Sequence, residues 1–243
     1  MSVDASSLER LVPAELDARD ATGRQTLALH LERYRFAARH ARPGRLLDLA
    51  CGVGYGTRLV ADEAAGVAEA VGVDVAPEAV AYARDHYARP GVRFEVCDAL
   101  AFRDAAGFDT IVSLETIEHV PDPQRLVAHL AGLLRPGGVL VASAPTTPST
   151  DVNLHHLHDF TDRSFARLFE PHGLLAAASF RQVQPYRLFA TVARREQRLA
   201  DMRPALLRYY ATHPGAAFRR LAATLRYGFT NRYLTVAWRR AAA

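Results

Sequence analysis

The residues best suited to chemistry stand in and after a glycine-rich turn at positions 47–56. Asp48 precedes three glycines that permit a tight turn and a close backbone approach, namely Gly52, Gly54 and Gly56. Asp74 lies 18 residues after Gly56, and Asp98 follows the next apolar segment. A carboxylate at the end of one strand can accept hydrogen bonds from ribose hydroxyls, and one at the end of the next can accept from an adenine amine. The pattern therefore predicts a nucleoside-containing ligand.

The turn differs in two ways from the turn that dinucleotide-binding enzymes use. Its spacing is Gly-x-Gly-x-Gly, whereas the dinucleotide fingerprint is Gly-x-Gly-x-x-Gly. Asp48 also lies in the approach to the turn, where its charge would oppose a pyrophosphate. The same charge would suit the cationic amino-acid end of S-adenosylmethionine. The sequence therefore favours S-adenosylmethionine over NAD.

These residues need a scaffold that brings strand ends together, and the hydrophobic pattern predicts one. Short apolar segments alternate with segments of helical periodicity, which is typical of a parallel sheet covered by helices. The predicted strands are 45–49, 70–75, 92–97, 108–114, 139–143, about 174–183, and 233–238. The predicted helices between them are 57–65, 77–88, 123–135 and 162–170. Pro77 is expected at a helix start and Thr161 as a helix cap.

Five segments, in order, resemble the successive motifs of class I S-adenosylmethionine-dependent methyltransferases: 46–56, 71–74, 97–99, 108–112 and 134–140. They lie within roughly residues 44–145. The resemblance implies that Asp48, Gly52 and Gly54 surround the methionine moiety, with Asp74 at the ribose and Asp98 at the adenine. It further implies cofactor contacts from neighbouring positions, which are Cys51, Val75, Ala99 and Leu114.

A second group of ionisable residues follows the fourth predicted strand, where Glu118 and His119 stand. A histidine-rich loop at 153–161 follows the fifth strand. Because the ends of parallel strands meet at one edge of the sheet, we expect both segments to face the transferring methyl group. Glu118, His119 and His156 are the catalytic candidates, since a histidine can remove a proton from a hydroxyl near neutral pH. Alternatively, Glu118 and His119 only begin the next helix and hydrogen-bond locally.

The same group would suit Mg²⁺ or another divalent ion, through these ligands: Glu115, Glu118, His119 and His156. Residues 115–123 resemble the metal-binding pattern of small-RNA 2′-O-methyltransferases, and ubiquinone-biosynthesis O-methyltransferases carry a similar string. Of His155, His156 and His158, His156 matches best in that comparison. A metal would bind an acceptor diol and lower the pKa of its hydroxyl. Without a metal, His119 or His156 would act as the base.

Positive charge is concentrated towards the C-terminus. Residues 181–243 carry 13 arginines and two acidic residues, which is a net charge of +11. Because the whole chain has a net charge of +4, residues 1–180 have a net charge of −7. Residues 184–231 are predicted to be helical, interrupted at Pro204 and Pro214, and to form an insertion or lid over the acceptor. Their mixture of arginine and aromatic residues would suit an anionic ligand, peripheral contact with an acidic membrane, or a homodimer contact, unless the arginines are simply solvated. RNA is a less favoured partner because no RNA-binding module is recognisable.

The predicted fold class is α/β, a Rossmann-like, seven-stranded, doubly wound and mostly parallel sheet. One methyltransferase domain is predicted over residues 1–243, divided into an N-terminal helix (15–41), a cofactor-binding core (44–183), the helical insertion (184–231) and the last strand (232–240). The two cysteines lack metal-type spacing. The sequence also contains no apolar segment typical of a signal peptide or a membrane span. Together with the cysteine content, this predicts a cytoplasmic location.

The predicted function is O-methylation of a small-molecule acceptor by S-adenosylmethionine. A sugar hydroxyl of a glycan precursor or glycosylated secondary metabolite is the preferred acceptor. Residues 30–37 approximate a motif of bacterial methyltransferases associated with sugar and surface-glycan genes. Three alternatives stay open: a quinone or phenol O-methyltransferase, a metal-assisted RNA 2′-O-methyltransferase, and a non-catalytic protein that only binds S-adenosylmethionine.

Overall fold

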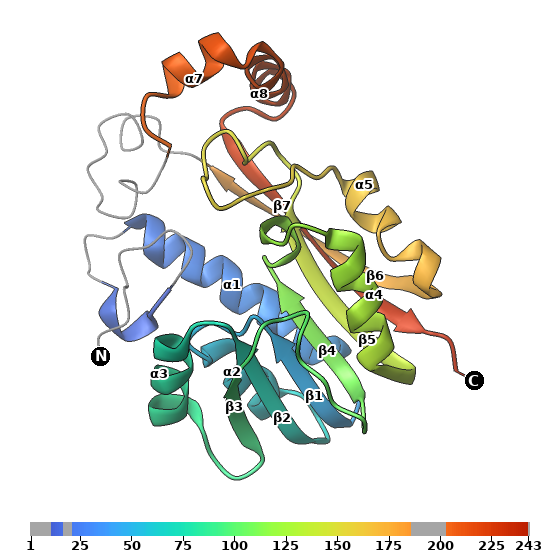
Figure 1. Ribbon diagram of the computed structural model, residues 1–243. Helices are drawn as coiled ribbons and strands as arrows, with labels where there is room; N and C mark the ends of the chain where they lie inside the picture. Colours follow the sequence, from blue (N-terminus) through green and yellow to red (C-terminus); the bar gives the residue numbers. More distant parts are fainter. Residues whose placement is uncertain (1–10, 17–20, 186–202, 243) are drawn as a thin grey trace.

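A computed structural model describes residues 11–16, 21–185 and 203–242 (Figure 1). Seven strands form one sheet in the order β3-β2-β1-β4-β5-β7-β6. Their bounds are Gly44–Leu49 (β1), Val67–Asp74 (β2), Val92–Val96 (β3), Phe108–Leu114 (β4), Leu134–Pro145 (β5), Leu174–Pro185 (β6) and Thr230–Arg240 (β7). The first five strands pair in parallel, whereas β7 runs antiparallel to both β5 and β6. The predicted Rossmann-like, mostly parallel sheet is therefore confirmed.

Helices cover both faces of the sheet, because the central strands are apolar on both sides. Leu46 and Leu47 of β1 are both fully buried but belong to two different hydrophobic clusters. One cluster includes side chains from Ala21–His40 (α1), Tyr55–Glu63 (α2) and Pro77–Tyr87 (α3). The other includes side chains from Pro123–Leu133 (α4) and Asp162–Arg167 (α5).

Local signals explain where several helices begin. Pro77 occupies the first turn of α3, where its missing N–H costs nothing. The Asp122 side chain accepts a hydrogen bond from the backbone N–H of Arg125 and so caps α4. The predicted cap Thr161 forms a reciprocal capping box with Ser164 at the start of α5.

Three predicted boundaries are wrong. The N-terminal helix does not run from residue 15, because Pro13–Glu15 form a 3-10 turn, Leu16 is extended, and α1 begins at Ala21. Strand β5 begins at Leu134 and not at the predicted residue 139, so α4 ends at Leu133 and not at 135. The insertion does not begin at 184, because Gln184 and Pro185 still pair with β7.

The described part of the insertion contains two helices, Leu206–Thr212 (α7) and Pro214–Tyr227 (α8). The prediction of helix over 186–202 lies outside the described residues. In Figure 1, α7 and α8 lie at one end of the molecule, beyond the loop that follows β5. None of the described helices is long and apolar enough to cross a membrane.

Candidate methyl-transfer site

The glycine-rich turn joins β1 to α2 through backbone conformations that suit glycine. Gly54 has a φ of +88°, and a Cβ there would lie 2.6 Å from the Cβ of Ala83. Gly56 has little space for another reason, since a Cβ would lie within the ring of Tyr34 on α1. These close approaches bring α1, α2 and α3 onto the turn. The backbone N–H groups at the start of α2 are therefore next to the end of β1.

Two of the predicted cofactor carboxylates stand on either side of this turn. Asp74 accepts hydrogen bonds from the backbone N–H of Gly52 (2.8 Å) and of Ala76 (3.0 Å). Asp48 is 1% exposed and accepts a 2.6 Å hydrogen bond from the Thr57 hydroxyl. Burial raises the pKa of Asp48 to about 7, although the bond from Thr57 opposes the shift. A cation placed beside Asp48 would therefore favour its charged form.

The other predicted cofactor residues lie at the ends of neighbouring strands. Val75 directly follows β2 and is 66% exposed, while Leu114 ends β4 and is buried. Asp98 is exposed after β3, and its carboxylate accepts from the backbone N–H groups of Leu100 and Ala101. Ala99 beside it is partly buried. All of these positions follow the carboxyl ends of adjacent strands, as the doubly wound fold requires.

Cys51 is buried in the turn, and burial raises the pKa of its thiol well above the ordinary value. The side chain is therefore a neutral thiol that fills space beneath the turn. This chemistry suits a packing role near the cofactor and does not suit a nucleophile.

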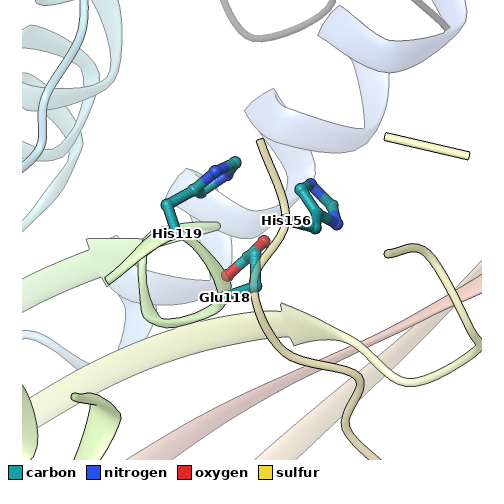
Figure 2. A group of neighbouring side chains, drawn as sticks. All are labelled: Glu118, His119 and His156. Atoms are coloured by element: carbon teal, nitrogen blue, oxygen red, sulfur yellow. The ribbon is translucent and has the colours of Figure 1, made fainter. Parts of the chain in front are cut away.

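Three of the predicted acceptor-side residues form one cluster, shown in Figure 2. Glu118 and His119 lie on the 3-10 turn Ile117–His119 (η2) after β4, and His156 lies in the loop after β5. One potential ligand atom from each of the three residues lies within 4.8 Å of those of the other two. The two imidazole rings meet edge to face, with centroids 4.7 Å apart. The backbone N–H of Leu157 donates to the carbonyl of Glu118 (2.8 Å), which fixes the loop against η2.

Hydrogen bonds orient both histidines. His119 Nδ1 lies 3.1 Å from the carbonyl oxygen of His155, and a carbonyl can only accept, so Nδ1 carries the proton. In the neutral ring, Nε2 of His119 is then the nitrogen that can accept a proton or bind a metal. His156 Nδ1 lies 2.7 Å from Ser149 Oγ, and burial, with the nearby His119 and His155, lowers the pKa of His156 to about 3. His156 is therefore neutral at physiological pH.

Two other residues that sequence considerations placed near this cluster have different partners. Glu115 has a φ of +50°, lies 3.2 Å from the buried guanidinium of Arg33 and accepts a 2.6 Å hydrogen bond from Ser143. It is not part of the Glu118, His119 and His156 group. His158 Nε2 donates to the carbonyl of Val120 (3.0 Å), a structural contact. The structure thus separates Glu115 from the four-ligand set that the spacing predicted.

A buried ion pair that the sequence did not reveal connects this loop to the helical insertion. Asp151 is 2% exposed and binds Arg220 of α8, with Nε 2.8 Å from the carboxylate. The hydroxyl of Tyr210 on α7 donates to the same carboxylate (2.7 Å). Arg203 donates to the backbone carbonyls of Thr150 and Asp151. The insertion therefore packs on the loop that carries His156. No local pattern in the sequence pairs residues this far apart.

Comparisons with known proteins agree with this geometry. Residues 47–142 match the family described as "Methyltransferase domain". Ubiquinone biosynthesis O-methyltransferase from Xanthomonas campestris pv. campestris is 39% identical over 112 residues, covering 44% of this chain and 46% of that protein. A probable S-adenosylmethionine-dependent methyltransferase from Mycolicibacterium smegmatis is 36% identical over 124 residues, covering 49% and 47%. The chain thus spans about half the length of the curated relatives it matches.

Solved structures share the fold at low sequence identity. The YcgJ protein from Bacillus subtilis superposes with a TM-score of 0.65 at 15% identity, covering 89% of this chain and 100% of that one. The N-methyltransferase NodS from Bradyrhizobium japonicum, in complex with S-adenosyl-L-homocysteine, gives 0.59 at 15% identity, covering 92% and 89%. The sheet order is that of a Rossmann-like fold. Residues 47–142, which include the glycine-rich turn, are similar to the methyltransferase-domain family, and about half of the chain is similar to the ubiquinone-biosynthesis O-methyltransferases.

Proposed function

We propose that this protein transfers the methyl group of S-adenosylmethionine to a hydroxyl group of a small molecule, bound at Glu118, His119 and His156. The observation that carries the proposal is the position of this cluster. It follows β4, next to β1 and the glycine-rich turn, where a methyl donor held by Asp48 and Asp74 would present its sulfonium. The three side chains offer one carboxylate and two oriented imidazoles, which suit an oxygen acceptor.

The chemistry needs alignment and removal of one proton. In the transfer, the acceptor oxygen forms a bond to the methyl carbon while the bond from carbon to sulfur breaks, and the hydroxyl proton leaves to a base. His119 fits the base, because its Nδ1–H donates to the His155 carbonyl, which leaves Nε2 as the basic nitrogen of the neutral ring. His156 fits that role less well, because its lowered pKa makes it a weak proton acceptor. It would instead orient the hydroxyl.

The cluster also fits a divalent ion, with three protein ligands and further positions open for the acceptor. Two ligands about 2.1 Å from one ion lie at most about 4.2 Å apart, so small side-chain rotations would bring these atoms into range. Glu118, His119 and His156 would hold the ion, and Ser149 would orient the ring of His156. A bound ion would lower the pKa of the acceptor hydroxyl.

The acceptor that we propose carries two neighbouring oxygens, which a carboxylate and two imidazoles can position together. A sugar diol satisfies this requirement, and the approximate motif at residues 30–37 favours it. A catechol satisfies it equally, and the similarity to ubiquinone biosynthesis O-methyltransferases favours that acceptor. A solved [4+2]-cyclase, SpnF, also shares the fold with a TM-score of 0.61 at 19% identity, covering 94% of this chain and 86% of that one. The fold alone therefore does not prove methyl transfer, and the test must detect a methylated product.

The test measures S-adenosylhomocysteine release and methylated product with matched panels of sugar diols and catechols. His119→Ala should lower kcat/KM by about 10²- to 10⁴-fold, the usual contribution of a general base. The affinity for S-adenosylmethionine, measured by calorimetry, should change less than about threefold. Glu170→Gln is the matched control for Glu118→Gln, because Glu170 is exposed on the 3-10 turn Glu170–His172.

Chelation separates the two chemical routes. If EDTA abolishes activity and Mg²⁺ or Mn²⁺ restores it, the metal route is supported. If EDTA has no effect and His119→Ala is inactive, the histidine acts as the base. Product formation that survives both Glu118→Gln and His119→Ala within about threefold would refute this site. A folded protein that binds S-adenosylmethionine but methylates no hydroxyl in either panel would refute the proposed acceptor class.

A further inference from the structure

The helices of the insertion present large apolar side chains to solvent. On α8, Phe218, Leu221 and Leu225 are exposed, and Leu225 is 80% exposed. Their spacing of three and four residues places them on one side of the helix, and we call this set the apolar stripe. Leu207 on α7 is 88% exposed. Aliphatic and aromatic side chains gathered on one exposed surface mark a site of interaction more often than isolated ones do.

The opposite side of α8 already has its contacts within the molecule. Ala216 is buried, and Arg220 forms the ion pair with Asp151 described above. At 100° per residue, Arg220 points away from the apolar stripe by more than a right angle. The stripe therefore does not face the loop beneath α8. Its side chains are exposed to solvent, and Figure 1 shows α7 and α8 at one end of the molecule.

The charged side chains of α7 and α8 themselves all carry positive charge. Residues 203–242 contain eight arginines and no aspartate or glutamate. Arg208 on α7 is exposed, as are Arg219 and Arg226 on α8. Arg219 and Arg226 are one residue C-terminal to Phe218 and Leu225, so each lies about 100° around α8 from that residue, on the same side of the helix. Arg219 also lies 3.7 Å from Asp159. An apolar stripe flanked by arginines is the pattern of helices that lie in the interface of an anionic bilayer.

We propose that α7 and α8 bind the surface of an anionic lipid bilayer, with the apolar stripe at the level of the headgroups and upper acyl chains. Charge complementarity selects this occupant. A second copy of the chain would bring two arginine-rich surfaces together without carboxylates from these helices to pair them. Single-stranded nucleic acid would need successive exposed aromatic rings for stacking. Phe218 and Phe229 are exposed, but aliphatic Leu221 and Leu225 stand between them and Tyr227 is partly buried.

Helices α7 and α8 contact the loop that carries His156 of the candidate site. Arg220 and Tyr210 hold Asp151, and the same loop carries Ser149 and His156. Bilayer binding would therefore bring the acceptor side of the sheet close to lipid. This consequence rests on the proposed function and points to an acceptor that is itself associated with the membrane. The binding does not rest on it, because vesicle binding is measured without turnover.

The test is co-sedimentation of the full chain with vesicles of phosphatidylcholine containing 30% phosphatidylglycerol, compared with phosphatidylcholine alone. Binding to the anionic vesicles should be at least tenfold tighter and should weaken as salt is raised. Arg208→Gln and Arg226→Gln should each weaken it about fivefold. Leu225→Ser should weaken it about tenfold, because a buried leucine side chain is replaced by a polar one.

Matched controls come from the opposite end of the last strand and from α5. Leu175 is 69% exposed at the start of β6 and pairs with Arg239, near the end of β7, whereas α8 precedes the start of β7. Leu175→Ser and Arg163→Gln on α5 should leave binding unchanged. Thermal melting and S-adenosylmethionine affinity check that each variant is folded.

Three outcomes would overturn the proposal. One is a folded wild-type protein that stays in the supernatant with anionic vesicles. Another is binding that Leu225→Ser and Leu175→Ser reduce equally. The third is a wild-type dimer, seen by sedimentation velocity, that Leu225→Ser converts to monomers while vesicle binding is undetectable, which would assign the stripe to self-association. If vesicles bind as expected but no hydroxyl acceptor is methylated, only the proposed function fails.

Discussion

Replacing Asp151 by asparagine should loosen α7 and α8 from the molecule while the sheet stays folded. The Asp151 carboxylate is buried and binds two residues of these helices, Arg220 and Tyr210. Asparagine keeps nearly the same shape and one acceptor oxygen, but it removes the negative charge. The guanidinium of Arg220 then stays partly buried without the Asp151 carboxylate. A buried charge that has lost its counter-ion lowers the free energy of unfolding.

The size of the effect follows from the geometry. Two unit charges 2.8 Å apart, the distance from Arg220 Nε to the carboxylate, attract by about 6 kcal/mol at an effective dielectric constant of 20. Desolvation of Asp151 offsets more than half of this, and the Arg220 side chain, 20% exposed, regains some hydration when the pair breaks. The remaining coupling is about 2–3 kcal/mol. Because 1.4 kcal/mol is tenfold, the helices should open about 30- to 150-fold more often.

Hydrogen exchange measures this opening directly. In Asp151→Asn, the amides of α8 should lose protection by that factor, while amides of β1 and β4 should keep theirs. A double-mutant cycle with Arg220→Gln should give the same coupling energy. Arg219→Gln is the control, because that side chain is 56% exposed and 3.7 Å from Asp159, and should cost less than about 0.5 kcal/mol. A coupling below about 0.5 kcal/mol, or equal loss of protection in β1, would refute the reasoning.

The same ion pair should also depend on pH. Burial raises the pKa of Asp151, but the hydrogen bonds and charge of Arg220 outweigh it and the net pKa is lowered. A carboxyl group whose folded pKa is below the unfolded value of about 3.9 stabilises the fold above that pH. The contribution disappears as pH falls through the folded pKa. Protection of α8 in the wild type and in Asp151→Asn should therefore converge in acid and differ fully at neutral pH.

Three further predictions concern the cofactor side and the core. Gly54→Ala should cost about 1–3 kcal/mol in the free energy of unfolding and weaken S-adenosylmethionine binding at least tenfold by calorimetry, because its Cβ would meet Ala83 at a positive φ. Because burial raises the pKa of Asp48 to about 7, S-adenosylmethionine binding at pH 6.5 should release up to about one proton. Calorimetry in buffers of different ionisation enthalpy measures this release, which Asp48→Asn should abolish. Phe169→Ala should lower the free energy of unfolding by about 3–5 kcal/mol in urea titration, because its fully buried ring stacks on Trp238.

The parts of the fold that sequence could predict are those specified by residues close together in the chain. Alternating apolar segments and glycine-rich turns identified every described strand, because strand and turn preferences are local. Boundaries were less predictable where pairing across the sheet decided them. Strand β5 extends back to Leu134, which pairs with Phe108, although the proline and glycines that follow it favour a turn. Tertiary pairing outweighed local preference there.

The donor side and the acceptor side differ for the same reason. Asp48 and Asp74 lie at the ends of neighbouring strands, and Gly52 and Gly54 lie in the turn between β1 and α2, so their order along the chain places them. Glu115 has equally regular spacing from Glu118, yet a left-handed backbone conformation carries it towards Arg33, a residue 82 positions earlier. The spacing of residues in the sequence predicts which of them share a turn. It does not predict which distant cation a carboxylate pairs with in the folded chain.

The loop after β5 shows why the acceptor side depends on such long-range contacts. Ser149 orients His156, Asp159 accepts hydrogen bonds from the backbone of residues 149 and 150, and Asp151 binds α8. Each of these contacts positions the loop from residues outside the group of Glu118, His119 and His156. A change in the helical insertion can therefore alter the orientation of His156 while the donor side is untouched. If the loop is the shared support that this geometry indicates, Asp151→Asn should lower kcat more than it weakens S-adenosylmethionine binding.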